Sequence, residues 1–92
     1  MKPVRKKIEQ AVKKVKGTWW PNIAGPYSKR GVPDLTVICN GKVIFLEIKE
    51  EGDRPRKLQE YTIEMIRKNG GQAFFVDPNN VDEIIKDVLG VK

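Results

Sequence analysis

The dipeptide Asn40-Gly41 joins two apolar runs within the stretch GVPDLTVICNGKVIFLEIK, residues 31 to 49. An Asn-Gly pair in this setting is the strongest short-range signal for a β-hairpin, because a two-residue type I′ turn needs positive φ at both positions. Counting outward from this turn, Cys39 pairs with Lys42 and Asp34 faces Glu47. The sequence therefore predicts a strand register as well as a topology.

The two faces of this hairpin differ in character, because side chains alternate along each strand. One face is apolar apart from Lys42 beside the turn, and we expect it to join the core; it consists of Leu35, Val37, Ile44, Leu46 and Ile48. The other face begins apolar with Ile38, Val43 and Phe45, and ends in Asp34, Glu47 and Lys49. Opposed like charges with Cβ atoms about 5 Å apart destabilise a sheet, so Asp34 and Glu47 require a nearby cation or a proton.

A divalent metal ion would resolve the conflict between the two carboxylates. All-oxygen ligation suits Mg²⁺ or Mn²⁺. Lys49 could then orient or deprotonate an attacking water, or stabilise charge on a phosphate. In the structural alternative, Lys49 only neutralises Glu47 while Asp34 caps the strand entrance or binds loop backbone. That alternative explains each residue separately but not their convergence.

Composition excludes several chemistries and favours a polyanionic partner. Cys39 is the only cysteine and there is no histidine, which excludes disulfide scaffolds, Cys/His zinc sites and nucleophiles that need a histidine base. Eighteen Lys and Arg against twelve Asp and Glu give a net charge of +6, which favours nucleic acid. No apolar run approaches the ~20 residues of a membrane span, and no signal peptide is recognisable at the N-terminus. We therefore expect an intracellular protein with no membrane partner.

Hydrophobic periodicity predicts the remaining elements. They are a helix over 3–16 stopped by Gly17, a short strand around 19–23, a helix from Leu58 to 69–71, a strand over 72–76 and a helix over 81–89. Asp53 is expected to cap the second helix with Pro55 in its first turn, and Asn80 with Glu83 resembles a capping box for the last. The order indicates one compact α/β domain over residues 1–92.

Pro33-Asp34, followed after twelve residues by Glu47-Ile48-Lys49, resembles the PD-(D/E)xK nuclease signature. With Gly31-Val32 before it, Gln59 at the start of the next helix and Glu9 on the first, the pattern is similar to the VRR-NUC branch, in the compact stand-alone form found in phages and bacteria. The resemblance covers roughly residues 4 to 76. It implies a restriction-endonuclease-like core, a mixed sheet flanked by helices, that cuts phosphodiester bonds with Mg²⁺ or Mn²⁺.

The resemblance also implies roles for individual residues. The expected metal ligands are Asp34, Glu47, the backbone carbonyl of Ile48 and, directly or through water, Glu9. Lys49 would handle the attacking water, and Gln59 would support Lys49 or that water. From the residues alone, Glu9 can equally be a surface acid paired with Arg5 or Lys13 at helical spacing, and Gln59 an ordinary first-turn residue.

Basic residues near this motif are candidates for DNA contact. The candidates are Lys13 on the first helix, Lys29 and Arg30 before the motif, and Arg54, Arg56 and Lys57 at the start of the second helix. We expect them to recognise DNA backbone and shape rather than sequence. Of Trp19 and Trp20, we expect one to serve the core or a dimer contact and leave base stacking as the alternative.

The expected function is a structure-selective DNA endonuclease that resolves four-way (Holliday) or related branched junctions. Symmetric cutting of a junction needs two active sites, so a homodimer fits that substrate. The alternatives are a flap- or nick-processing nuclease, a restriction-type or general DNA-degrading nuclease on the same core, and a non-catalytic basic module that only binds nucleic acid.

Overall fold

The computed structural model describes residues 2–23 and 31–92. Its helices are α1 (Pro3–Lys14), α2 (Lys57–Lys68) and α3 (Val81–Asp87), and its strands are β1 (Thr18–Pro21), β2 (Leu35–Cys39), β3 (Lys42–Ile48) and β4 (Gln72–Val76). The order α-β-β-β-α-β-α agrees with the sequence prediction. The predicted strand around residues 19–23 lies slightly earlier, at Thr18–Pro21. The expected bounds of β4 are confirmed.

The four strands form one mixed sheet in the order β1-β2-β3-β4. The first three strands are antiparallel, whereas β3 and β4 run parallel through the crossover helix α2. Cys39 pairs with Lys42, and the register continues to Leu35 opposite Leu46. Asn40 and Gly41 both have positive φ, as the predicted two-residue turn requires. The hairpin register read from the sequence is therefore confirmed.

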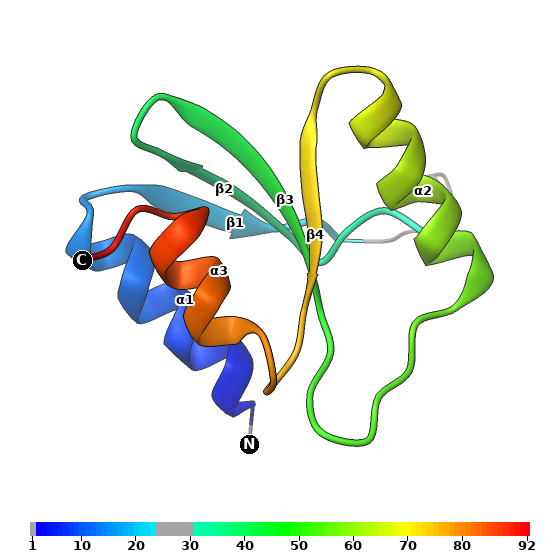
Figure 1. Cartoon of the computed structure of the whole chain (residues 1–92), viewed down its shortest axis with the longest axis horizontal. Helices are drawn as coiled ribbons and strands as arrows, with labels where there is room; N and C mark the ends of the chain where they lie inside the picture. Colours follow the sequence, from blue (N-terminus) through cyan, green and yellow to red (C-terminus); the bar gives the residue numbers. More distant parts are fainter. Residues whose placement is uncertain (1, 24–30) are drawn as a thin grey trace.

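Helices cover both faces of the sheet (Figure 1). Helices α1 and α3 lie side by side on one face, where Lys7 Nζ is 3.4 Å from Asp82 Oδ1, and α2 lies on the other. The main core fills the space between the α1/α3 layer and the apolar hairpin face; it includes Ile8, Val12, Leu35, Val37, Ile44, Leu46, Ile48 and Leu89. Within residues 2–23 and 31–92, no helix is both long and apolar enough to cross a membrane.

Helix α1 ends at Lys14, two residues before the predicted end, and the chain then turns sharply into β1. Lys16 adopts a left-handed φ of 56°, and the Gly17 N–H donates to Val12 O at 2.9 Å. A Cβ atom on Gly17 would lie 2.6 Å from Cys39 Cβ. Glycine is therefore required here because helix and hairpin approach too closely for any side chain.

The two predicted helix caps are wrong in detail. Arg56, not Asp53, is the N-cap of α2, so Pro55 precedes the helix; Asp53 instead closes a tight turn by accepting the Glu50 N–H at 3.0 Å. Asn80 precedes α3 but makes no side-chain cap, because its Oδ1 accepts the Asp77 N–H and its Nδ2 donates to Phe75 O. Other local hydrogen bonds, within the adjacent turns, thus replace the expected caps.

The two tryptophans separate as expected. Trp19 is partly buried against the core, and Lys13 Nζ lies 5.9 Å from the centre of its ring. Trp20 belongs to the opposite face of β1 and keeps 44% of its surface exposed.

Candidate active site

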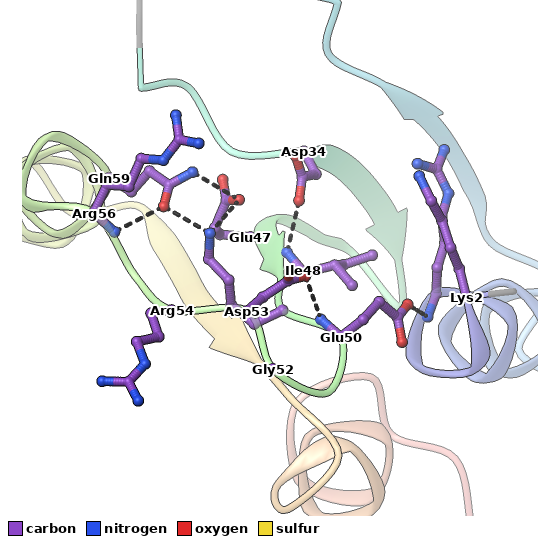
Figure 2. A pocket seen from close by; sticks show the side chains of 12 residues that line it. Lys2, Asp34, Glu47, Ile48, Glu50, Gly52, Asp53, Arg54, Arg56 and Gln59 are labelled. Carbon is purple, nitrogen blue, oxygen red and sulfur yellow. Dashed lines mark hydrogen bonds and ion pairs between the residues drawn. The ribbon is translucent and has the colours of Figure 1, made fainter.

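The polar end of the hairpin brings Asp34, Glu47 and Lys49 together. Asp34 directly precedes β2, and Glu47 is the penultimate residue of β3. The two acids therefore occupy the next opposed position after the last β2–β3 pair, Leu35 with Leu46. Asp34 Oδ2 accepts the Ile48 backbone N–H at 2.9 Å, so its carboxylate lies across the end of β3 (Figure 2). The convergence predicted from the register is present.

Glu47 is a buried carboxylate with incomplete pairing. It is only 3% exposed, and its Oε1 atom has no hydrogen-bond partner among the described residues. The pKa of Glu47 is raised to about 7, mainly by burial and further by the neighbouring Asp34 carboxyl, while Lys49 partly opposes these effects. A buried carboxylate with a raised pKa is stabilised by binding either a proton or an additional cation.

Gln59, on the first turn of α2, connects the acid and the lysine. Its Nε2 donates to Glu47 Oε2 at 3.2 Å, and its Oε1 accepts from Lys49 Nζ at 2.7 Å. The same Oε1 accepts the Arg56 N–H at 3.0 Å, which fixes the side chain to the helix start. Lys49 Nζ also lies 3.5 Å from Glu47 Oε2. Figure 2 shows Gln59 pointing toward Glu47. Gln59 therefore holds both charged groups in place.

These residues line an open pocket of about 560 Å³. The loop between β3 and α2 and the beginning of α1 supply the rest of the wall. The lining residues are Lys2, Arg5, Asp34, Glu47, Ile48, Lys49, Glu50, Gly52, Asp53, Arg54, Arg56 and Gln59. Cations from α1 and from the loop thus flank the acidic pair on two sides.

Glu50 attaches the start of α1 to this pocket. Its two carboxylate oxygens accept the backbone N–H groups of Val4 and Arg5 at 3.0 and 3.2 Å. A carboxylate here satisfies two otherwise unpaired donors and complements the helix dipole. No local sequence pattern indicates this cap, because Glu50 lies 46 and 45 residues along the chain from Val4 and Arg5.

Glu9 does not line the acidic pocket. Its Oε2 accepts from Arg5 Nε at 3.2 Å, which is the helical pairing that the sequence left open as an alternative. In residues 2–23 and 31–92, no three Asp, Glu, Cys or His side chains come together as a metal site. The structure thus leaves Glu9 apart from Asp34 and Glu47, and its role as a ligand stays a prediction.

The predicted DNA-contacting residues fall into three groups. Arg54 and Arg56 line the pocket. Lys13 and Lys57 are exposed, and Lys13 lies over Trp19 rather than at the pocket. Lys29 and Arg30 lie outside the described residues. Lys2 and Arg5, which were not among the predicted DNA contacts, also line the pocket. Glu50 holds the start of α1 beside it.

The donor set fits an Mg²⁺ or Mn²⁺ ion. The unpartnered Glu47 Oε1 is a buried anionic oxygen that a cation would satisfy, and Asp34 supplies a second carboxylate beside it. Oxygen donors without cysteine or histidine are the ligands that these hard cations prefer.

A mixed four-stranded sheet between helices, with paired acids and a lysine at the end of its hairpin, defines the restriction-endonuclease-like PD-(D/E)xK class. No family model matches the sequence. A solved structure described as "VRR_NUC domain" matches it with a TM-score of 0.77 and 30% identity, over 92% of each chain. The chain therefore belongs to the VRR-NUC family and is a nuclease of that type.

Two further proteins are similar to this chain. "Putative nuclease p44" of Acyrthosiphon pisum secondary endosymbiont phage 1 is 29% identical over 86 residues, which cover 92% of this chain and 90% of that protein. Archaeoglobus fulgidus Hjc, described as a Holliday junction resolvase from an archaeal hyperthermophile, matches with a TM-score of 0.52 and 16% identity. That match covers 79% of this chain and 64% of Hjc, and it shows the fold alone.

Proposed function

We propose that this chain is an Mg²⁺- or Mn²⁺-dependent DNA endonuclease whose active site is the pocket at the polar end of the hairpin. The buried Glu47 carries the proposal, because one of its oxygens lacks a partner within residues 2–23 and 31–92 while the other is held beside Lys49 by Gln59. A protein that used these residues only for structure would gain nothing from an unpaired buried carboxylate oxygen, which costs free energy.

Asp34, Glu47 and the backbone carbonyl of Ile48 would hold the metal ion. Glu9 would contribute from α1 through water, since its own carboxylate is paired with Arg5. A bound ion would supply Lewis-acid stabilisation of the charge that develops on the phosphate during hydrolysis.

Lys49 would act on the water that attacks the phosphorus. Its ammonium group donates to Gln59 Oε1 and lies beside Glu47, so its direction is set before substrate arrives. A positioned lysine can orient the water or stabilise negative charge on a phosphate oxygen. Gln59 would act as a positioning residue for both charged groups.

DNA would cross the pocket with its backbone between two groups of cations. Arg54 and Arg56 extend from the loop before α2, and Lys2 and Arg5 lie at the start of α1. Cations on both sides of the carboxylates suit the phosphates that flank a scissile bond. Lys13, Lys29, Arg30 and Lys57 would extend this contact beyond the pocket.

The proposed substrate is branched DNA, with four-way junctions first, cut by a homodimer in an intracellular, phage-related or bacterial setting. The support is the likeness in fold to a structure described as a Holliday junction resolvase and the sequence likeness to a phage protein named as a nuclease. Two active sites related by two-fold symmetry match the symmetry of a four-way junction.

Cleavage of labelled four-way junction, flap, nicked and linear duplex DNA tests this function in EDTA, Mg²⁺ and Mn²⁺. The test variant, Asp34→Asn, removes the charge of a proposed metal ligand. The matched control, Asp53→Asn, removes a charge from a turn residue that lines the same pocket. We expect paired junction cuts by wild type and Asp53→Asn, and their loss in EDTA and in Asp34→Asn. Intact DNA under every condition, with equal binding by all three proteins, would instead identify a non-catalytic DNA-binding module.

A further inference from the structure

Asn22, directly after β1, makes three hydrogen bonds around the peptide units that flank Asp34. Its backbone N–H donates to Asp34 O at 2.8 Å, and its side-chain Nδ2 donates to Pro33 O at 3.0 Å. Its Oδ1 accepts from the hydroxyl of buried Thr36 at 2.9 Å. One residue therefore holds the carbonyl on each side of the Asp34 Cα atom.

Holding both carbonyls restricts the two peptide planes that meet at Asp34. The direction of the Cα–Cβ bond follows from these planes, so the carboxylate is aimed before any ligand binds. The backbone bond continues the β1–β2 ladder beyond the pair Pro21 and Leu35. The side-chain bond to Pro33 has no equivalent in a regular ladder, because it reaches one residue further along the loop.

The Pro33 carbonyl sets which way the Asn22 amide points, because a carbonyl can only accept and so must face Nδ2. The Asn22 Oδ1 is then turned toward Thr36, whose hydroxyl donates to it. Thr36 belongs to β2 and is buried, so its position is set by the sheet. Thr36 therefore anchors the Asn22 side chain, and Asn22 holds the segment that carries Asp34.

We propose that Asn22 is a positioning residue for Asp34, which preorganises the Asp34 carboxylate for cation binding and Ile48 contact. The inference rests on the proposed function, in which Asp34 is a metal ligand. Residues that orient a ligand typically change metal affinity or activity by about 10- to 100-fold when they are removed.

Asn22→Ala tests this role with two measurements that need no cleavage. The first is Mn²⁺ affinity of the DNA-free protein by electron paramagnetic resonance. The second is hydrogen exchange of the Ile48 amide, which donates to Asp34 Oδ2; the adjacent Lys49 amide donates to Val76 O at 2.7 Å and is the internal reference.

The matched control is Asn40→Gly, which removes another side-chain bond to a distant carbonyl, Leu89 O at 2.9 Å, at the opposite end of the hairpin. Glycine tolerates the positive φ of Asn40. Thr36→Val is a milder second variant that keeps Asn22 but removes the hydroxyl that donates to its Oδ1.

We expect Asn22→Ala to weaken Mn²⁺ binding about tenfold or more and to speed Ile48 exchange relative to Lys49. Thr36→Val should also weaken Mn²⁺ binding and speed Ile48 exchange, but by less than Asn22→Ala. Asn40→Gly should match wild type in both measurements. Wild-type Mn²⁺ affinity and Ile48 exchange in both Asn22→Ala and Thr36→Val would overturn the inference. If wild type binds no Mn²⁺, the metal proposal fails, and the Ile48 amide still decides whether Asn22 positions Asp34.

Discussion

Glu47→Gln should stabilise the metal-free protein at alkaline pH, although it removes a residue proposed to be essential for activity. The raised pKa of Glu47, from 4.5 to about 7, means that the folded state binds the proton more tightly than the unfolded chain does. This contribution to stability is complete below pH 4.5 and is lost as the pH rises through 7. Glutamine has nearly the same shape but does not ionise.

The size of the effect follows from the same pKa. The change from 4.5 to about 7 corresponds to about 3 kcal/mol of ionisation cost in the folded state. This pKa already includes the opposing effect of Lys49. An amide replaces the carboxyl imperfectly in its hydrogen bonds, so we expect Glu47→Gln to be more stable by about 1–3 kcal/mol at pH 8. In a chain of this length, each kcal/mol raises the melting temperature by about 4–8 °C.

Urea unfolding in EDTA, followed by circular dichroism from pH 4 to pH 8, measures this difference. The two proteins should be close in stability near pH 4 and diverge as wild type loses stability toward pH 8. Mn²⁺ should then stabilise wild type at pH 8 and leave Glu47→Gln little changed. A variant that is less stable than wild type at every pH would refute the idea that burial and incomplete pairing raise the pKa of Glu47.

Three further substitutions test other contacts. Gln59→Ala should lower single-turnover cleavage by about 10- to 100-fold, because Lys49 loses its fixed acceptor, while thermal unfolding changes by only about 1 kcal/mol. Glu50→Ala removes the cap of α1 and should cost about 1–2 kcal/mol in urea unfolding; unchanged stability would show that this cap is dispensable. Gly17→Ala forces a Cβ against Cys39 and should destabilise by about 1–3 kcal/mol, whereas a neutral result in thermal melts would contradict the close approach of helix and hairpin.

Local sequence determined the hairpin and the meeting of its acids. Asn40-Gly41 selects a turn, the turn selects the register, and side-chain alternation then places Asp34, Glu47 and Lys49 on one face. Each step acts between residues that are close along two adjacent strands. The apolar face of the same hairpin was predictable for the same reason, and its residues are buried in the core.

Tertiary packing alone decided how the rest of the site is built. Glu50 caps α1, Asn22 holds the segment before β2, and the direction of α1 leaves Glu9 outside the pocket lining. At Asp53 and Asn80 the competition was local instead: their side chains bind backbone groups of the adjacent turns and not the expected helix starts. Hydrophobic periodicity determines which way a side chain faces within a helix or strand. Contacts between elements depend on how the loops place those elements, and short sequence patterns do not predict that placement.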